Sequence, residues 1–226
     1  MDFEYNPPTN PYLDILYRDD DIAVCNKPSG LLSVRGRAPE HQDSLQSRAQ
    51  TVWPELGIVH RLDMDTSGII VLALHKEALR RLSSQFQNRK TEKTYIANVW
   101  GIPDEDEGTI ELPLICDWPN RPKQKVCYEY GKSAKTHWKV INNQGNITQV
   151  ELTPITGRTH QLRVHLAEIG HPIIGDRFYA SGQALDAVPR LNLHAIKLGF
   201  HHPMTEQSLC FESPPQFEVK KKNQLL

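Results

Sequence analysis

Cysteine is scarce in this chain and never closely paired. Four cysteines, Cys25, Cys116, Cys127 and Cys210, are scattered over 226 residues with no Cys-x-x-Cys. In a chain of this length the scatter predicts free thiols in a reducing compartment and excludes a disulfide-stapled module. The first residues are acidic and polar, and they lack the basic and apolar regions of a signal peptide. We therefore expect a cytoplasmic protein.

Long apolar runs and a charge excess are lacking as well. No run approaches the roughly 20 apolar residues that span a bilayer, so no membrane partner is expected. The net charge is −1, whereas a dedicated nucleic-acid binder usually carries a basic excess. Basic residues nevertheless gather locally, at Arg121, Lys123, Lys125, Lys132 and Lys135 and at Arg80, Arg81, Arg89, Lys90 and Lys93. Each cluster fits a phosphate-binding face or, equally, a solvated surface.

Motifs for nucleotide cofactors and for serine hydrolases are absent. Ten histidines raise the possibility of a metal, but His160 and His165 lack the glutamate of a zinc-binding helix, and His201-His202 precede a proline. We expect neither a cofactor nor a metal.

Strand patterns outnumber helix patterns. Helical spacing of apolar residues predicts helices at 76–89 and 159–168, with Asp43 capping a short one that ends at Ala49 and Gly170 closing the helix at 159–168. Strands are expected at 13–17, 22–26, 68–74, 94–100, 109–112, 134–141, 147–153, 191–200 and 208–211. This balance predicts an α+β fold with a largely antiparallel sheet and few flanking helices, forming a single domain over 1–226 with its core at about 12–212 and flexible termini.

The richest stretch is His60–Gly68, which places a cation and two carboxylates on a turn before the apolar run Ile69–Leu74. A loop held by a buried strand is a common site for catalytic side chains. Asp63 is the candidate nucleophile, although an aspartate here can also simply cap a turn. Asp65 fits either chemistry or the fixing of the loop through backbone hydrogen bonds.

Asp65-Thr66-Ser67-Gly68 also invites comparison with the Asp-Thr-Gly-Ser loop of aspartic proteases. The glycine and serine are exchanged here, and no second Asp-Thr-Gly occurs. A single copy would have to dimerise to share a proton between two aspartates. We therefore disfavour a protease.

Two further segments carry candidate residues. Tyr95 begins an apolar strand, where a tyrosine usually packs but can also stack on a flipped base. In Thr156–His165, Thr156 or Thr159 is expected to cap a helix whose N-terminus favours an anion. Arg158 and Arg163 supply guanidiniums suited to carboxylate or phosphate, or lie on the surface as ordinary residues.

These segments together resemble the RluA family of pseudouridine synthases. The resemblance rests on His60–Gly68, Lys93–Gly101, Thr156–Asp176 and Tyr17–Leu32, in order from about residue 12 to 212. It implies a pseudouridine-synthase-like fold with a central active-site cleft. It also implies catalysis by Asp63, an active-site Tyr95, and an Arg163 that pairs with Asp63 and keeps it anionic. Leu114–Val126 and the lack of an N-terminal S4 domain look like the dual-specificity branch, which acts on 23S rRNA and tRNA anticodon stem-loops.

The resemblance implies an RNA uridine isomerase that flips its target base and works as a monomer on RNA, without DNA. Attack by Asp63 at C6 of the uracil or at C1′ of the ribose stays open. RNA contacts are expected from Arg61, Arg158, His160, Arg121, Lys123 and Lys125, and the tail Lys220–Lys222 either touches RNA or frays. The alternative is a non-catalytic module that binds RNA stem-loops by shape.

Overall fold

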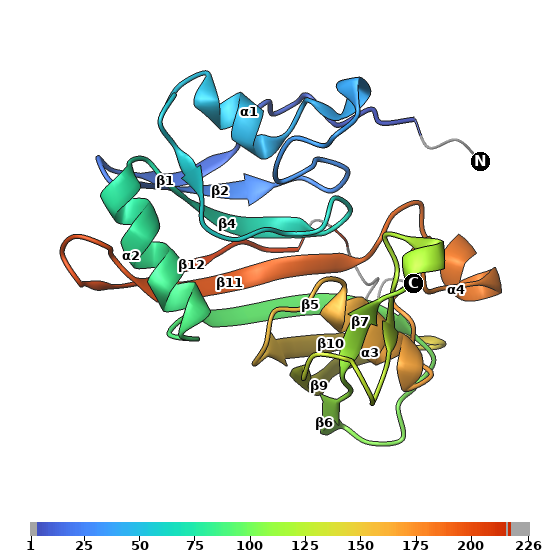
Figure 1. The fold of residues 1–226 in the computed structure, drawn as a ribbon. Helices are drawn as coiled ribbons and strands as arrows, with labels where there is room; N and C mark the ends of the chain where they lie inside the picture. The colour runs from blue at the N-terminus through green and yellow to red at the C-terminus, as the bar shows by residue number, and fades with distance from the viewer. Residues whose placement is uncertain (1–3, 216, 218–226) are drawn as a thin grey trace, which may run out of the picture. The chain divides into compact units, whose positions relative to one another are not determined.

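The computed structural model describes residues 4–215 and Phe217. Its backbone divides into two compact units, the first formed by residues 4–93 and 195–215 and the second by residues 94–194 with Phe217 (Figure 1). That the two act as one catalytic domain stays a prediction.

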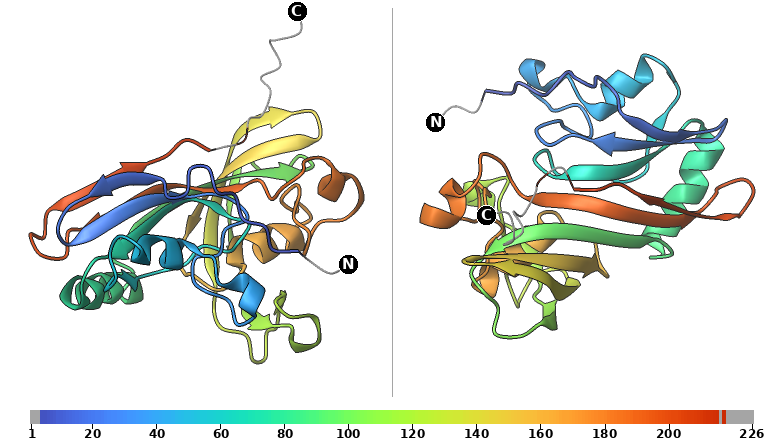
Figure 2. Two further views of the ribbon diagram at one scale, coloured as in Figure 1. Left: turned by 90° about the horizontal axis from the view of Figure 1, so that it is seen from above. Right: turned by 180° about the vertical axis from the view of Figure 1, so that it is seen from behind.

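The first unit is built on a sheet with the neighbour order β1-β2-β4-β11 (Figure 2). Its strands are β1 (Ile15–Arg18), β2 (Ile22–Lys27), β3 (Gly57–Ile58), β4 (Ser67–Ala73), β11 (Leu193–His201) and β12 (Ser208–Glu212). The β1–β2, β2–β4, β3–β4 and β11–β12 pairings are all antiparallel. Every residue of β2 and β4 is buried, which explains the apolar runs Ile22–Cys25 and Ile69–Ala73 in their sequences.

Successive residues of a strand point to opposite sides of the sheet. Alternate residues of β2 and β4 therefore pack against two different helices. Ile22, Val24, Ile69 and Val71 meet α2 (Lys76–Gln87) through Ala78 and Leu82. The alternate residues, Ala23, Cys25, Ile70 and Leu72, meet α1 (Leu45–Gln50) through Leu45 and Ala49. A short 3-10 helix, η1, spans Pro39–His41.

The cap of α1 differs from the sequence prediction. Ser44 is the N-cap and forms a reciprocal capping box with Ser47. Asp43 instead accepts two hydrogen bonds from the buried guanidinium of Arg48, at 2.8 and 2.6 Å. The prediction of an Asp43 cap was wrong because a serine one position later has the same capping chemistry.

The second unit carries a four-stranded antiparallel arrangement in the order β5-β10-β9-β6. The strands are β5 (Glu92–Trp100), β6 (Glu107–Glu111), β9 (Lys135–Gln144) and β10 (Ile147–Pro154). The core on one face holds α3 (Gln161–Glu168) through Leu162 and Leu166. β7 (Leu114–Cys116) and β8 (Gln124–Val126) form a separate two-stranded sheet, joined through the 3-10 helix η2 (Trp118–Asn120), and α4 spans Gly182–Asp186.

The α+β prediction is confirmed, since the fold combines antiparallel sheets with few helices. The nine expected strands are present within a few residues of their predicted bounds, whereas β3, β7, β8 and α4 were not predicted. All four cysteines are free, as expected. Within the described residues, no helix is both long enough and apolar enough to cross a membrane. Lys220–Lys222 and the outermost termini lie outside the described residues.

Candidate active site

The loop that carries Asp63 is held by hydrogen bonds to its backbone. On the residue before Asp63, the Ser33 hydroxyl donates to the Leu62 carbonyl at 2.7 Å and accepts the Leu62 N–H at 3.1 Å. On the residue after it, the Met64 carbonyl accepts from the Gly30 N–H at 2.9 Å and from Lys27 at 3.0 Å. The Ser29 hydroxyl donates to the Asp65 carbonyl at 2.7 Å. Leu62, Met64 and Asp65 are thus fixed around Asp63.

Lys27 is the centre of this arrangement. Its side chain is fully buried, and its ammonium donates to the carbonyls of Pro28, Leu31 and Met64 at 2.9, 2.7 and 3.0 Å. These three carbonyl dipoles point at the ammonium and help to stabilise the desolvated cation. Lys27 therefore ties the turn after β2 to the loop of Asp63.

A backbone hydrogen bond closes the C-terminal end of the same loop. The Thr66 N–H donates to the Asp63 carbonyl at 3.2 Å, forming a turn that leads directly into β4. Gly68 has a φ of +117°, and a Cβ at this position would collide with the backbone of Ala195. Only glycine fits there. Asp63 is half-buried and Arg61 is exposed, so the contact of Arg61 with RNA stays a prediction.

His60 anchors the other end of the loop. Its Nε2 accepts the Val71 N–H at 3.1 Å, and its ring stacks on Phe86 with centroids 4.4 Å apart. Burial lowers the pKa of His60 from 6.5 to about 3, with a further contribution from the charge of Lys93. A neutral ring is what the acceptor role requires, because a protonated imidazole has no lone pair left for the Val71 N–H.

In the second unit, Arg163 is buried and forms a bidentate ion pair with Asp176. Nε and Nη2 lie 2.7 Å from Oδ2 and Oδ1 of Asp176, and both side chains are almost fully buried. The guanidinium also lies over the rings of Phe178 and Tyr179, at 5.1 and 5.3 Å from their centroids. Planar pairing and ring contacts together fix the orientation of Arg163.

The surroundings of Arg163 extend the sequence prediction for α3. Leu162, Leu166 and Ile169 do face the core, and Gly170, with a φ of +86°, closes the helix as expected. Most of the remaining surface of the helix is not solvated, however, since Gln161 through Leu166 are all buried and Glu168 is exposed only at the end. A helix that is buried on most sides shows no clear amphipathic pattern in its sequence, and Asp176, which pairs with Arg163, lies 13 residues downstream.

The start of α3 also differs from the prediction. His160 is the N-cap, in the left-handed region with a φ of 53°, and it makes no side-chain cap bond. Thr156 instead donates to the side-chain carbonyl of Gln161 at 2.7 Å, so the predicted threonine cap was wrong. His160 is buried and its Nδ1 lies 2.7 Å from the Tyr179 hydroxyl. Arg158 is exposed and donates to the Ser133 carbonyl. RNA binding by His160 and Arg158 stays a prediction.

Tyr95 lies on β5 opposite Leu152 and packs against the core of the second unit. Tyr95 is only partly buried, so it packs against the core and is also partly accessible to solvent. Stacking of its ring on a base stays a prediction. Asp63 belongs to the first unit, whereas Tyr95 and Arg163 belong to the second. The pairing of Asp63 with Arg163 therefore also stays a prediction.

The two predicted basic clusters differ in how far their charges are compensated. In the cluster of 80–93, Arg80 and Arg81 pair with Glu77 at 2.7 and 2.6 Å. Burial lowers the pKa of Lys93. In the cluster of 121–135, Lys125 lies 3.3 Å from Asp117 and Lys135 lies 2.6 Å from Glu111. Within the part of the chain that the structure describes, Arg121, Lys123 and Lys132 make no ion pair.

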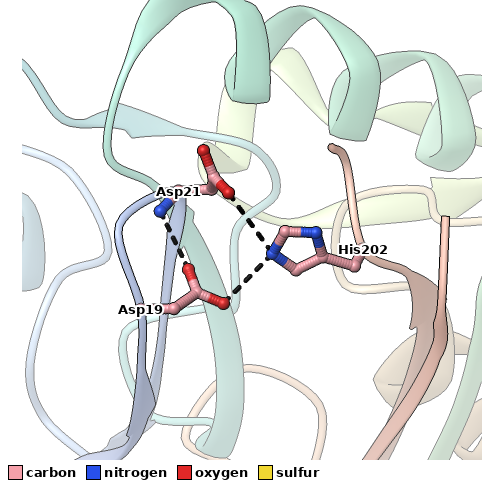
Figure 3. A group of neighbouring side chains, drawn as sticks. All are labelled: Asp19, Asp21 and His202. Carbon is pink, nitrogen blue, oxygen red and sulfur yellow. Dashed lines mark hydrogen bonds and ion pairs between the residues drawn. The ribbon is translucent and has the colours of Figure 1, made fainter. Parts of the chain in front are cut away.

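One group of side chains has the composition of a metal site. Asp19, Asp21 and His202 bring their ligand atoms within 4.8 Å of one another (Figure 3). Nδ1 of His202 accepts the Thr205 N–H at 3.1 Å, so the proton of the neutral ring is on Nε2, which donates to Asp19 at 3.0 Å. A metal at Nε2 would need the opposite tautomer. The group is better explained as a hydrogen-bonded staple.

A hollow of about 430 Å³ lies over β6, β9 and β10 in the second unit. His137 and Thr153 line it. Their neighbours Trp138 and Leu152 point into the core together with Tyr95, so the hollow lies on the opposite face of the sheet. None of the predicted site residues lines it. We assign it no part in the chemistry.

Comparison with known proteins gives the loop of Asp63 its context. Residues 21–168 match the family model described as RNA pseudouridylate synthase. The chain belongs to this family. This RNA pseudouridylate synthase is 57% identical over 214 residues to the Dual-specificity RNA pseudouridine synthase RluA of Escherichia coli (strain K12), with 94% of this chain and 98% of that protein covered.

Solved structures agree on the fold of this pseudouridylate synthase. Human RNA Pseudouridylate Synthase Domain Containing 1 matches with a TM-score of 0.78 and 29% identity, covering 94% of this chain and 87% of that one. Human RNA Pseudouridylate Synthase Domain Containing 4 gives a TM-score of 0.71 and 26% identity, with 89% and 88% covered. The predictions of family, fold and isomerase class are confirmed. The protease and the non-catalytic module are not favoured.

Proposed function

We propose that Asp63 is the nucleophile of a uridine-to-pseudouridine isomerisation, supported by Tyr95 and Arg163. The observation that carries this proposal is the fixation of Leu62, Met64 and Asp65 by Ser33, Lys27, Gly30 and Ser29, which holds Asp63 on a rigid loop. A nucleophile carried by a fixed backbone loses less conformational freedom when it attacks.

In the proposed reaction Asp63 adds to C6 of the uracil or to C1′ of the ribose. The bond between N1 and C1′ breaks, the uracil turns, and C5 bonds to C1′. The bond from Asp63 to C6 or C1′ then breaks and the carboxylate is freed. The proton on C5 is lost to solvent while N1 gains one, so substrate and product are isomers and no redox partner is needed. Asp176 holds Arg163 in one orientation. The proposed role of the guanidinium is to pair with Asp63 and keep that carboxylate anionic.

The substrates we propose are stem-loops of 23S rRNA and tRNA anticodon arms, in keeping with the dual specificity in the name of the Escherichia coli relative. An unpaired loop uridine is the least costly base to flip out of its stack. Arg61, Arg158, His160, Arg121, Lys123 and Lys125 are the proposed RNA contacts. We propose that the protein acts as a cytoplasmic monomer.

Tritium release tests the proposal directly. Transcripts of 23S rRNA fragments and of tRNAs carry tritium at C5 of uridine, and the purified protein is added without cofactor. We expect release from both RNA classes, in amounts that match the pseudouridine found by digestion. Release from one class alone would contradict the proposed dual specificity, and release from neither would contradict the proposed activity.

A further inference from the structure

The segment Pro113–Lys132, which we name the β7–β8 arm, carries an unusual set of exposed side chains. Trp118, Tyr128 and Tyr130 are 66%, 79% and 71% exposed. These are the three most exposed large hydrophobic side chains among the residues that the structure describes. Large exposed apolar groups that gather in one segment indicate an interaction surface.

The arm is a fixed platform because Leu114 and Val126 anchor it to the core and hydrogen bonds hold its backbone. Leu114 and Val126 pack against Val164 of α3 in a small core. The Gln124 N–H donates to the Tyr179 hydroxyl at 2.8 Å, and the Cys127 N–H donates to the Pro113 carbonyl at 2.9 Å. The exposed aromatics are therefore presented by a backbone that is tied to the rest of its unit.

The charges around these aromatic rings are mainly positive. Between Pro113 and Lys132 there are four basic and two acidic residues, a net charge of +2, while the whole chain has −1. The Arg121 guanidinium lies 4.6 Å from the centroid of the Trp118 ring. Indole and guanidinium therefore form a stacked pair, and each presents a flat face to a further ring.

The combination of exposed aromatics and cations favours one partner. Aromatic rings interspersed with basic residues are the means by which proteins hold single-stranded nucleic acid, each stacked base contributing about 1–3 kcal/mol. A partner protein would usually meet aliphatic side chains as well, but Leu114 and Val126 of the arm are turned toward α3. An RNA duplex would offer phosphates and no free base faces.

We propose that Trp118, Tyr128 and Tyr130 stack on unpaired nucleotides of the substrate RNA beyond the target uridine, while Arg121 and Lys123 contact the phosphates between them. This inference rests on the proposed function, and it gives a physical basis for a preference of the protein for RNA loops over RNA duplexes. Stacking tolerates different bases, so the arm selects unpaired RNA largely irrespective of its sequence.

Binding of a labelled tRNA stem-loop, measured by anisotropy over a series of salt concentrations, tests the inference. Trp118→Ala and Tyr128→Ala should each weaken binding about 5- to 150-fold, and Trp118→Phe should retain most of the affinity. The salt dependence should be unchanged in these variants and shallower by about one ion in Lys123→Ala. Ile102→Ala, which removes a side chain that is 56% exposed outside the arm, is the matched control.

Two results would overturn the inference. The first is wild-type affinity in the double variant of Trp118→Ala and Tyr128→Ala. The second is an equal loss for Trp118→Phe and Trp118→Ala, which would show that the flat ring is not what matters. Thermal melting of each variant separates loss of fold from loss of contact. Tritium release by the wild-type protein is measured on the same RNA, so failure of the proposed activity is seen independently of failure of stacking.

Discussion

Arg163 and Asp176 form a buried bidentate ion pair, with two N–O distances of 2.7 Å. Both side chains are at most 2% exposed, so neither charge can be satisfied by water. The pair fixes one edge of the guanidinium and thereby the direction in which the rest of it points. Asp176 therefore acts as a positioning residue for Arg163.

Asp176→Ala should remove the carboxylate that accepts two hydrogen bonds from the buried guanidinium of Arg163. Breaking a buried pair from one side costs about 3–5 kcal/mol, so we expect a loss of that size in the free energy of unfolding. Urea denaturation measures it, with the exposed Glu168→Ala on α3 as the control. A loss below about 1 kcal/mol would show that the pair is not needed.

Lys27→Met should uncouple the loop of Asp63 from the turn after β2. Methionine has a similar shape but no N–H groups, so the carbonyls of Pro28, Leu31 and Met64 lose the hydrogen bonds from Lys27, while Met64 keeps the bond from the Gly30 N–H. We expect a destabilisation of at least about 2 kcal/mol and a larger fall in kcat than in substrate affinity. Lys90→Met, at an exposed position after α2, is the matched control. Equal kcat values in Lys27→Met and wild type would contradict the proposed role.

The pKa of His60 predicts a pH dependence of stability. In the folded state burial lowers this pKa to about 3, whereas the unfolded chain has the ordinary value of 6.5. Between these values the unfolded state binds more protons, so the stability contributed by neutral His60 is complete above about pH 6.5 and declines toward pH 3. His60→Gln offers an acceptor that does not titrate.

Unfolding free energies of wild type and His60→Gln, measured between pH 4 and 8, check this expectation. The difference between the two proteins should shrink or reverse as the pH falls. A difference that stays constant over this range would mean that His60 does not remain neutral.

The staple of Asp19, Asp21 and His202 should not respond to metal. Addition of Zn²⁺ or Mn²⁺ is expected to leave the melting temperature unchanged, because Nε2 of His202 carries the proton given to Asp19. His202→Ala should lower the free energy of unfolding by about 1–3 kcal/mol, since it removes one of the hydrogen bonds that the charged Asp19 carboxylate accepts. A metal-dependent rise in melting temperature that His202→Ala abolishes would favour a metal site instead.

Sequence patterns predicted the long elements well because each buries a regular set of side chains. The apolar run Ile69–Leu74 forms most of β4. The helix predicted at 76–89 is α2, and its Leu79, Leu82 and Phe86 all pack in one core cluster. The two- and three-residue strands β3, β7 and β8 were missed, since a period of two cannot be seen over so short a stretch.

The candidate site was predictable only in part. Asp63 stands in a motif rich in turn residues and charge, and its local sequence pointed to a site. The residues that hold it, Lys27, Ser29 and Ser33, lie some 30 to 36 positions away, and only the fold brings them to the loop. Asp176 was missed in the same way, because an ion partner beyond the helix leaves no periodic signal in the sequence.

The central claim is that Asp63 supplies the nucleophile. The decisive measurement is single-turnover tritium release from C5-labelled tRNA stem-loop by Asp63→Asn, with RNA binding by the same variant measured in parallel. We predict that release is abolished while the affinity for RNA and the melting temperature stay close to wild type. Release by Asp63→Asn at the wild-type rate would contradict the account.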